Sequence, residues 1–213
     1  MLDTLITSAL TTSLLFVPVT GSEILARQAP VAGQEGELVE NPGILAVETL
    51  DLSNRYPVES ISEGFKENIL IALGFLNSSN LAGLILQPRE VFAFHNKGIL
   101  LEFKENKIIT QESDFTTNTG YKVVAGLGGN GVCHLASLMN KAANKAGLTV
   151  TAPTSHSFAK IPGIEAEYGT SISTRNSPER QNLYIKNNFD FAVQFKFFLV
   201  GDNLSLTILP IVN

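Results

Sequence analysis

The chain has 213 residues, a formal net charge of −5, and a composition that is 44% hydrophobic and 16% charged. This balance is typical of a globular protein, and the length predicts one domain, with or without a tail. The acidic charge argues against a nucleic-acid partner, because phosphate binding needs clustered Lys and Arg. The single cysteine, Cys133, excludes an internal disulfide framework.

Residues 1–22 contain a mostly apolar stretch that Thr and Ser interrupt. The stretch is too short and too rich in hydroxyl groups to span a membrane, and it resembles the apolar core of a secretory signal. Asp3 gives it the wrong charge for a signal, so a buried N-terminal helix or strand is the alternative. We expect an exported protein of the cell envelope or the extracellular space, with any membrane association confined to residues 1–22.

Residues 23–46 are rich in Gly, Pro, Ala and Glu and show no periodicity, which predicts a linker or an exposed arm. Residues 47–213 then form a single domain. Its first helix is expected over 62–77, where Phe65, Ile69 and further apolar residues recur at helical spacing.

The middle of the chain alternates strand and helix patterns. A strand is expected over 90–94, and two more over 98–106 and 107–113, joined by a hairpin turn. A glycine-rich turn follows, and then a helix from 132 to 146. Gly147 stands where a helix commonly ends.

The remaining elements are predicted to be strands. Short strand patterns occur at 148–153 and 182–187, and a clear alternation over 191–199 and 204–208 surrounds a Gly-Asp-Asn turn. The last two runs therefore predict an antiparallel hairpin. Together the elements predict an α+β fold, with two helices packed on a mostly antiparallel sheet.

Cys133 is not on the apolar face of its predicted helix. That face holds Leu135, Met139, Ala142 and Ala146, with Leu138 at its edge. Cys133 falls about 160° from Leu135, on the side of Ser137, Asn140 and Asn144. A lone cysteine is most often a small buried hydrophobic residue, and the helical phase argues against that interpretation here.

The first turn of a helix favours an anion, which predicts a lowered pKa and a nucleophilic thiolate for Cys133. The glycines before it permit positive φ and close approach of a substrate. Backbone N–H groups at Gly131 and Val132 could then hold the oxyanion formed when a thiolate attacks a carbonyl. The same glycines could bind phosphate, although the sequence is not a Walker loop.

A cysteine nucleophile needs a base, and the chain has three histidines, His95, His134 and His156. His156 lies in a polar, Pro-bounded stretch whose side chains can reach a helix N-terminus, so it is the candidate base, with a structural loop histidine as the alternative. His134 points away from Cys133 on a helix. Zinc held by Cys133 and the histidines is a further alternative, but no ligand spacing supports it. We expect no metal and no cofactor.

The motif "GLGGNGVCHLASLMNKAANKAGL" at 126–148 resembles the central motif of the VanW domain family, with its glycine turn, cysteine and Ala-rich helix. Upstream, "LQPREVFAFH" at 86–95 resembles that family's Pro-Gly-Glu-Val-Phe-Ser-Phe stretch. Downstream, "SHSFAKIPG" at 155–163 and "LYIKNNFDFAVQFKFFL" at 183–199 resemble its later segments. The resemblance covers a motif core of residues 84–199, in order.

The resemblance implies a cysteine-dependent L,D-transpeptidase acting on peptidoglycan stem peptides. Cys133 would be the nucleophile and His156 its base. The sequence departs from the family pattern at Asn130, where a glycine is usual, at His134, where Gln is usual, and at Arg89, where a turn glycine is usual.

The substrate pocket is expected to include His134, His95, Asn130, Ser155 and Arg175. Arg175 and Lys122 are the candidates for binding the substrate carboxylate. We therefore expect a cell-envelope cysteine acyltransferase that forms a thioester at Cys133. The alternative is a non-catalytic envelope module that binds a wall peptide or glycopeptide in the same cleft.

Overall fold

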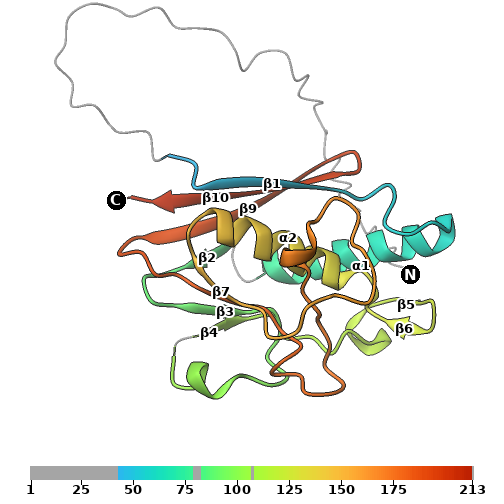
Figure 1. Ribbon diagram of the computed structural model, residues 1–213, viewed down its shortest axis with the longest axis horizontal. Helices are drawn as coiled ribbons and strands as arrows, with labels where there is room; N and C mark the ends of the chain where they lie inside the picture. Colours follow the sequence, from blue (N-terminus) through green and yellow to red (C-terminus); the bar gives the residue numbers. More distant parts are fainter. Residues whose placement is uncertain (1–42, 79–82, 107, 213) are drawn as a thin grey trace, which may run out of the picture. The chain divides into compact units, whose positions relative to one another are not determined.

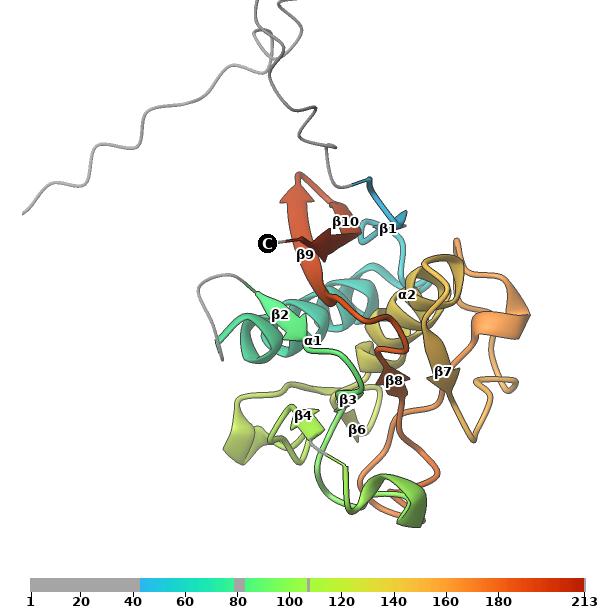
Figure 2. The ribbon, with the colours of Figure 1, turned by 90° about the vertical axis from the view of Figure 1, so that its left-hand side faces the viewer.

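Two sheets and two helices build the part of the chain that the computed structural model describes, which is residues 43–78, 83–106 and 108–212. The helices are α1 (Glu59–Ser78) and α2 (Val132–Lys145), with short 3-10 turns η1 (Leu101–Phe103), η2 (Thr117–Thr119) and η3 (Ala166–Tyr168). Both helices lie between the two sheets (Figures 1 and 2). The α+β class expected from the sequence is therefore confirmed.

The first sheet is fully antiparallel, with the strand order β1-β10-β9-β2. Its strands are β1 (Ala46–Asp51), β10 (Asn203–Ile211), β9 (Ala192–Val200) and β2 (Leu84–Leu86). The predicted C-terminal hairpin is β9–β10, with Gly201 at φ 59° in its turn. One face of the sheet carries Leu204, Leu206 and Ile208, which are fully buried against the helices.

The second sheet has the order β4-β3-β8-β7. Its strands are β4 (Ile108–Thr110), β3 (Val91–Ala93), β8 (Tyr184–Lys186) and β7 (Thr149–Thr151), and a separate ribbon joins β5 (Val123–Val124) to β6 (Leu127–Gly128). β3 and β4 are parallel, and the other pairs are antiparallel. The expected single sheet is thus two sheets with the helices between them.

The two helices form where the apolar periodicity predicts them. In α1 the residues Phe65, Ile69, Leu73 and Leu76 are all buried. In α2 the predicted apolar stripe is buried as well, and the helix stops at Gly147, whose φ is 80°. A positive φ costs glycine little, so Gly147 can end the helix as predicted.

The predicted hairpin over 98–113 is wrong. Residues 101–103 form η1, and β4 pairs in parallel with β3 instead of with the preceding segment. The reason is tertiary, because Phe103 packs against Tyr184 with ring centroids 4.7 Å apart, and the Tyr184 hydroxyl accepts the Leu100 N–H. These contacts turn the chain across the sheet edge.

Strands β1 and β2 and the β5–β6 ribbon were not expected from the sequence. β1 begins at Ala46, and the Leu45 N–H already donates to the Ile208 carbonyl, so the folded unit starts before residue 47. The expected segment 1–22 and most of the expected linker 23–46 lie outside the described residues.

Arg89 occupies a backbone conformation that accounts for the glycine usual at this position in the family pattern. Its φ of 69° lies in the left-handed region, where glycine is favoured over residues with a Cβ atom. The turn before β3 therefore keeps the glycine-like geometry without the glycine.

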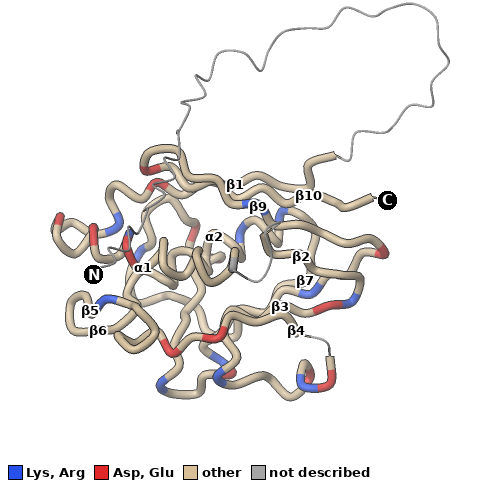
Figure 3. The backbone as a smooth tube through the Cα atoms, turned by 180° about the vertical axis from the view of Figure 1, so that it is seen from behind, with Lys and Arg blue, Asp and Glu red and all other residues tan. Residues whose placement is uncertain are grey.

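Charged residues of both signs are interspersed along the described backbone (Figure 3). None of the helices in the described ranges combines the length and the apolar character needed to cross a membrane.

Candidate functional site

The glycine-rich turn before α2 is a packing device. Gly131 caps the helix at φ 110°, and a Cβ atom there would lie 2.5 Å from the carbonyl oxygen of Phe65 in α1. A Cβ atom on Gly129 would lie 2.7 Å from the Cβ of Phe115. The turn therefore needs glycine for close approach of the chain to itself, and this approach sets the point where α2 begins.

Asn130, between these glycines, also supports the turn. Its side-chain amide donates to the carbonyl of Val124 at 2.8 Å, and its own carbonyl accepts from Asn68 of α1 at 2.9 Å. The residue thus joins the β5–β6 ribbon to the start of α2.

Cys133 is the second residue of α2 and is half-buried. Its Sγ accepts the backbone N–H of Ile172 at 3.3 Å and lies 3.7 Å from the carbonyl oxygen of the same residue. The sulfur therefore contacts both the backbone N–H and the carbonyl of Ile172, which lies in the segment of residues 168–172 beside α2.

Two further polar side chains of α2 hold that same segment. Ser137 accepts the Thr170 N–H at 2.9 Å, and Asn140 donates to the Tyr168 carbonyl at 3.0 Å. Cys133, Ser137 and Asn140 stand at i, i+4 and i+7 and fix residues 172, 170 and 168 in turn. We call these three side chains the polar clamp.

Burial raises the pKa of the Cys133 thiol to about 11, although the N–H groups of Ile172 and of Cys133 itself act in the opposite direction. The predicted lowered pKa is therefore wrong for this state of the protein. Desolvation of the thiolate exceeds the stabilisation that the helix N-terminus and the two N–H groups supply. At neutral pH the sulfur is a thiol.

A groove of about 510 Å³ opens at the sulfur, and we call it the Cys133 groove. Of the predicted pocket residues, Asn130 and Arg175 line it, and so does Val132, one of the predicted oxyanion donors. The partly exposed side chains of Leu127 and Phe158 line it as well, and the rest of its wall comes mainly from residues 114–118 and 171–175.

The predicted oxyanion donors are only partly free. The Val132 N–H already donates to the Gly129 carbonyl at 3.1 Å, so Val132 is not available for this role in this state. The His134 N–H is likewise used, by the Gly131 carbonyl at 2.9 Å. The N–H groups that act on the sulfur are those of Ile172 and Cys133.

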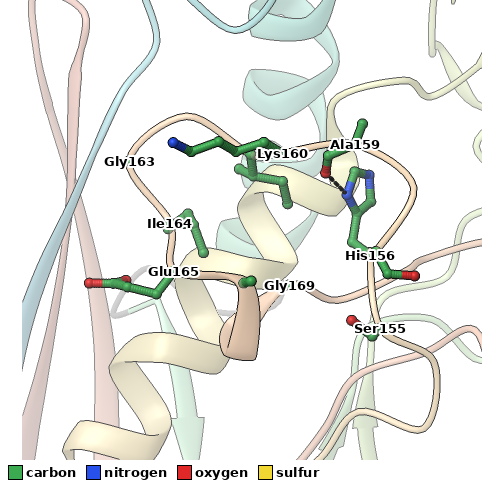
Figure 4. Close-up of a pocket in the computed structure, with 11 residues that line it drawn as sticks. Ser155, His156, Ala159, Lys160, Gly163, Ile164, Glu165 and Gly169 are labelled. Atoms are coloured by element: carbon green, nitrogen blue, oxygen red, sulfur yellow. Dashed lines mark hydrogen bonds between the residues drawn. The ribbon is translucent and has the colours of Figure 1, made fainter.

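His156 lies in a neighbouring cavity of about 670 Å³, together with Ser155 (Figure 4), and we call it the His156 cavity. Nδ1 of His156 lies 3.0 Å from the Ala159 carbonyl oxygen, which only accepts hydrogen bonds. Nδ1 therefore carries the proton and Nε2 carries the lone pair, which is the tautomer that a base at Nε2 requires. The Ala159 carbonyl is thus the group that orients the ring.

Within the described part of the chain, His156 and Cys133 do not form a hydrogen bond with each other. The structure brings them to adjoining walls, because the His156 ring packs on Phe158 with centroids 4.0 Å apart and Phe158 lines the Cys133 groove. Burial lowers the pKa of His156 below its usual 6.5, so the imidazole is neutral at pH 7.

His95 and His134, which were predicted as pocket residues, are both buried and line neither the Cys133 groove nor the His156 cavity. His95 is 0% exposed, with Nε2 on the Gln181 carbonyl at 3.0 Å and Nδ1 accepting the Lys97 N–H at 3.3 Å. It supports the groove wall from behind. Burial and then Arg55 lower the pKa of His134 to about 3, and its ring stands edge-on to His156 with centroids 6.2 Å apart.

Metal ligation was weighed from the sequence as an alternative for Cys133. Within residues 43–78, 83–106 and 108–212, no group of three or more His, Cys, Asp or Glu side chains could hold a metal ion.

Sequence reasoning missed the segment that the clamp holds. Ile172, Thr170 and Tyr168 act through backbone atoms, which leave no signature in residue type. The signal that could have found the clamp was the polar side of α2, because Ser137 shares that side with Cys133.

Comparison with known proteins identifies the family. A family model described as "VanW like protein" matches residues 66–209, which is more than half of the chain. Neither the curated proteins nor the solved structures contain a match. The matched region includes all of α2, the polar clamp, Cys133 and His156. The chain therefore belongs to the VanW family, a cell-envelope family associated with vancomycin resistance.

Proposed function

We propose that this protein is a cysteine acyltransferase that acts on peptidoglycan stem peptides, with Cys133 as nucleophile and His156 as base. The observation that carries the proposal is the position of the Cys133 sulfur. It lies on the wall of an open groove at the start of a helix, with the N–H of Ile172 directed at it from 3.3 Å. A thiolate formed there would keep this donor and the helix N-terminus.

The raised thiol pKa means that the sulfur needs a base at the moment of attack. His156 suits this task because its lowered pKa leaves the imidazole neutral at pH 7, its Nδ1–H is held by Ala159, and its Nε2 is the basic atom. Proton transfer requires that Nε2 of His156 reach Sγ of Cys133, directly or through one water, and we propose that substrate binding brings the two atoms together. The adjoining Phe158 is 77% exposed, so the wall between them is not fixed by burial.

In the first step, the Sγ–H proton passes to Nε2 of His156 while sulfur bonds to a peptide carbonyl carbon of the stem. The carbon–nitrogen bond then breaks, the leaving D-amino acid takes the proton from His156, and a thioester remains on Cys133. Attack by an amine or by water on the thioester carbon releases the product and regenerates the thiol. The exposed Arg175 at the groove supplies a positive charge for a substrate carboxylate.

Intact-mass spectrometry after incubation with tetrapeptide stems tests the proposal. We expect an acyl adduct on the wild type that is absent from Cys133→Ser, in which a hydroxyl can still accept the Ile172 N–H and preserve the fold. His156→Gln should lower adduct formation while the thiol remains in place. In the wild type, adduct formation should fall as pH drops below 6.5, because His156 becomes protonated. Absence of an adduct with every stem, at every pH, would exclude the acyltransferase.

A second candidate is a non-catalytic module that binds wall peptide in the Cys133 groove. The observation that favours it is the role of Cys133 in the polar clamp, combined with the raised pKa of its thiol. In that case Cys133→Ser would bind stem peptides as tightly as the wild type, and neither protein would alter them.

A further inference from the structure

The His156 cavity adjoins the Cys133 groove along one segment of chain. Gly169 lines the cavity, and Ser171 and Ile172, directly after it, line the groove. The rings of His156 and Phe158, which contact each other at an interplanar angle of 46°, stand between the two spaces, since His156 lines the first and Phe158 the second. A molecule in the cavity would therefore have one end beside the base and close to the groove.

The two sides of the cavity differ in chemistry. Figure 4 shows the side chains of Lys160 and Glu165 on one side and the His156 ring on the other. The lining also includes Ile161 and Ile164, whose side chains can contact methylene groups. The cavity thus offers a charged side, an apolar lining and a proton acceptor.

The charged side is positive on balance. Glu165 receives the Lys141 ammonium at 2.8 Å. Lys141 also pairs with Glu48 at 3.0 Å, and Lys145 gives Glu48 a second ammonium, so these two lysines balance the two carboxylates. Among the described residues, no carboxylate forms an ion pair with Lys160. Lys160 therefore remains to attract a carboxylate, while Nε2 of His156 can accept a proton from an amine.

We propose that the His156 cavity holds the acceptor of the acyl transfer, an aliphatic primary amine whose carrier also bears a free carboxylate. The side-chain amine of a diamino acid in a second stem peptide has this chemistry. The inference rests on the proposed function, since it assigns the second substrate of that reaction.

The transfer step follows from this placement. The lone pair of the neutral amine forms a bond to the thioester carbon, and the carbon–sulfur bond breaks with its electrons passing to Sγ of Cys133. The amine proton moves to Nε2 of His156 and then to sulfur. The products are an amide and the free thiol, with no other reactant needed.

Competition between amine and water measures the acceptor site directly. The acylated protein is offered Nα-acetyl-L-lysine, which has both groups, or Nα-acetyl-L-lysine amide, which lacks the carboxylate. In the wild type we expect the ratio of amide to hydrolysed product to be about fivefold higher for the carboxylate form. Lys160→Gln should remove this preference, and Lys104→Gln, an exposed lysine outside the cavity, should keep it.

A preference that persists in Lys160→Gln, or that the wild type does not show, would overturn the inference and leave the acyltransferase standing. If no thioester forms, the proposed function fails, and binding to Cys133→Ser decides the inference alone. There, amide NMR shifts should place Nα-acetyl-L-lysine against residues 159–169, with affinity about fivefold lower in Lys160→Gln. Shifts confined to other residues would exclude the site.

Discussion

The two faces of α2 stabilise the fold in different ways. One face packs Leu135, Leu138 and Met139, all at 0% exposure, into the core between the sheets. The other face is also buried at Ser137 and Asn140, yet it carries polar side chains that hold the backbone of residues 168–172. The first face contributes through apolar area, and the second through directed hydrogen bonds.

The polar face therefore shows how a cysteine can take the place of a hydroxyl or amide side chain in a row of hydrogen bonds. Cys133 occupies the first position of the polar face, where the groove opens, and its sulfur holds Ile172 as Ser137 holds Thr170. On a hydrogen-bonded polar face, a cysteine can replace a serine and accept the same backbone N–H, and the core does not have to repack. An apolar face does not allow this, because its atoms are close-packed.

The largest expected effect is on the apolar face. Leu138→Ala should lower the free energy of unfolding by about 2–5 kcal/mol, because it leaves a cavity beneath both sheets. Urea denaturation measures the change. A loss of less than about 1 kcal/mol would show that the apolar face does not dominate the stability of α2.

On the polar face, Asn140→Ala should cost about 1–3 kcal/mol, because the Tyr168 carbonyl loses one of its two donors and the buried Thr170 hydroxyl loses the amide that donates to it. The same denaturation experiment applies. Hydrogen exchange should also quicken at residues 168–172 while the core strands stay protected. Uniform quickening would mean that the two faces unfold together.

The next effect concerns the reactivity of the thiol. With a pKa of about 11, Cys133 should react with iodoacetamide at pH 7.5 about tenfold more slowly than free cysteine. The folded thiol holds its proton more tightly than the unfolded one, so stability should fall as pH rises from 9 towards 11. Alkylation faster than that of free cysteine would contradict the raised pKa and support the hypothesis that Cys133 is already a thiolate at neutral pH.

The smallest expected effect is on stability, and it tests the role of Cys133 in the polar clamp separately from its proposed role as nucleophile. Cys133→Ser should change the free energy of unfolding by less than about 1 kcal/mol, since a hydroxyl can accept the Ile172 N–H. Cys133→Ala should be less stable than Cys133→Ser, because the buried N–H loses its acceptor. Equal stability of the two variants would show that the sulfur contributes nothing to the clamp.

Much of the fold could be predicted from local patterns. The periodicity of Phe65 to Leu76 predicts α1, Gly147 marks the end of α2, and the alternation around Gly201 predicts the β9–β10 hairpin. These signals lie within one element or its turn. The 98–113 hairpin failed because Phe103 packs on Tyr184, a residue far along the chain.

The candidate site divides in the same way. Helical phase placed Cys133 off the apolar stripe, and the structure agrees, since the residue lines a groove. The same patterns could not show that His95 and His134 are buried, because burial of a histidine depends on what packs over it. They also could not predict the thiol pKa, because desolvation comes from residues distant in sequence.

Sequence patterns alone were enough to predict the α+β class, the helix with Cys133 in its first turn, and the family to which the chain belongs. Periodicity, turn residues and motif order are properties of the sequence, so they can be recognised without a three-dimensional structure. The three-dimensional structure was needed to show three contacts. The polar face of α2 forms hydrogen bonds with residues 168–172, the Ala159 carbonyl orients His156, and the glycine turn packs on α1. Each of those contacts has a backbone atom as one partner, and no residue type records where a backbone atom will lie.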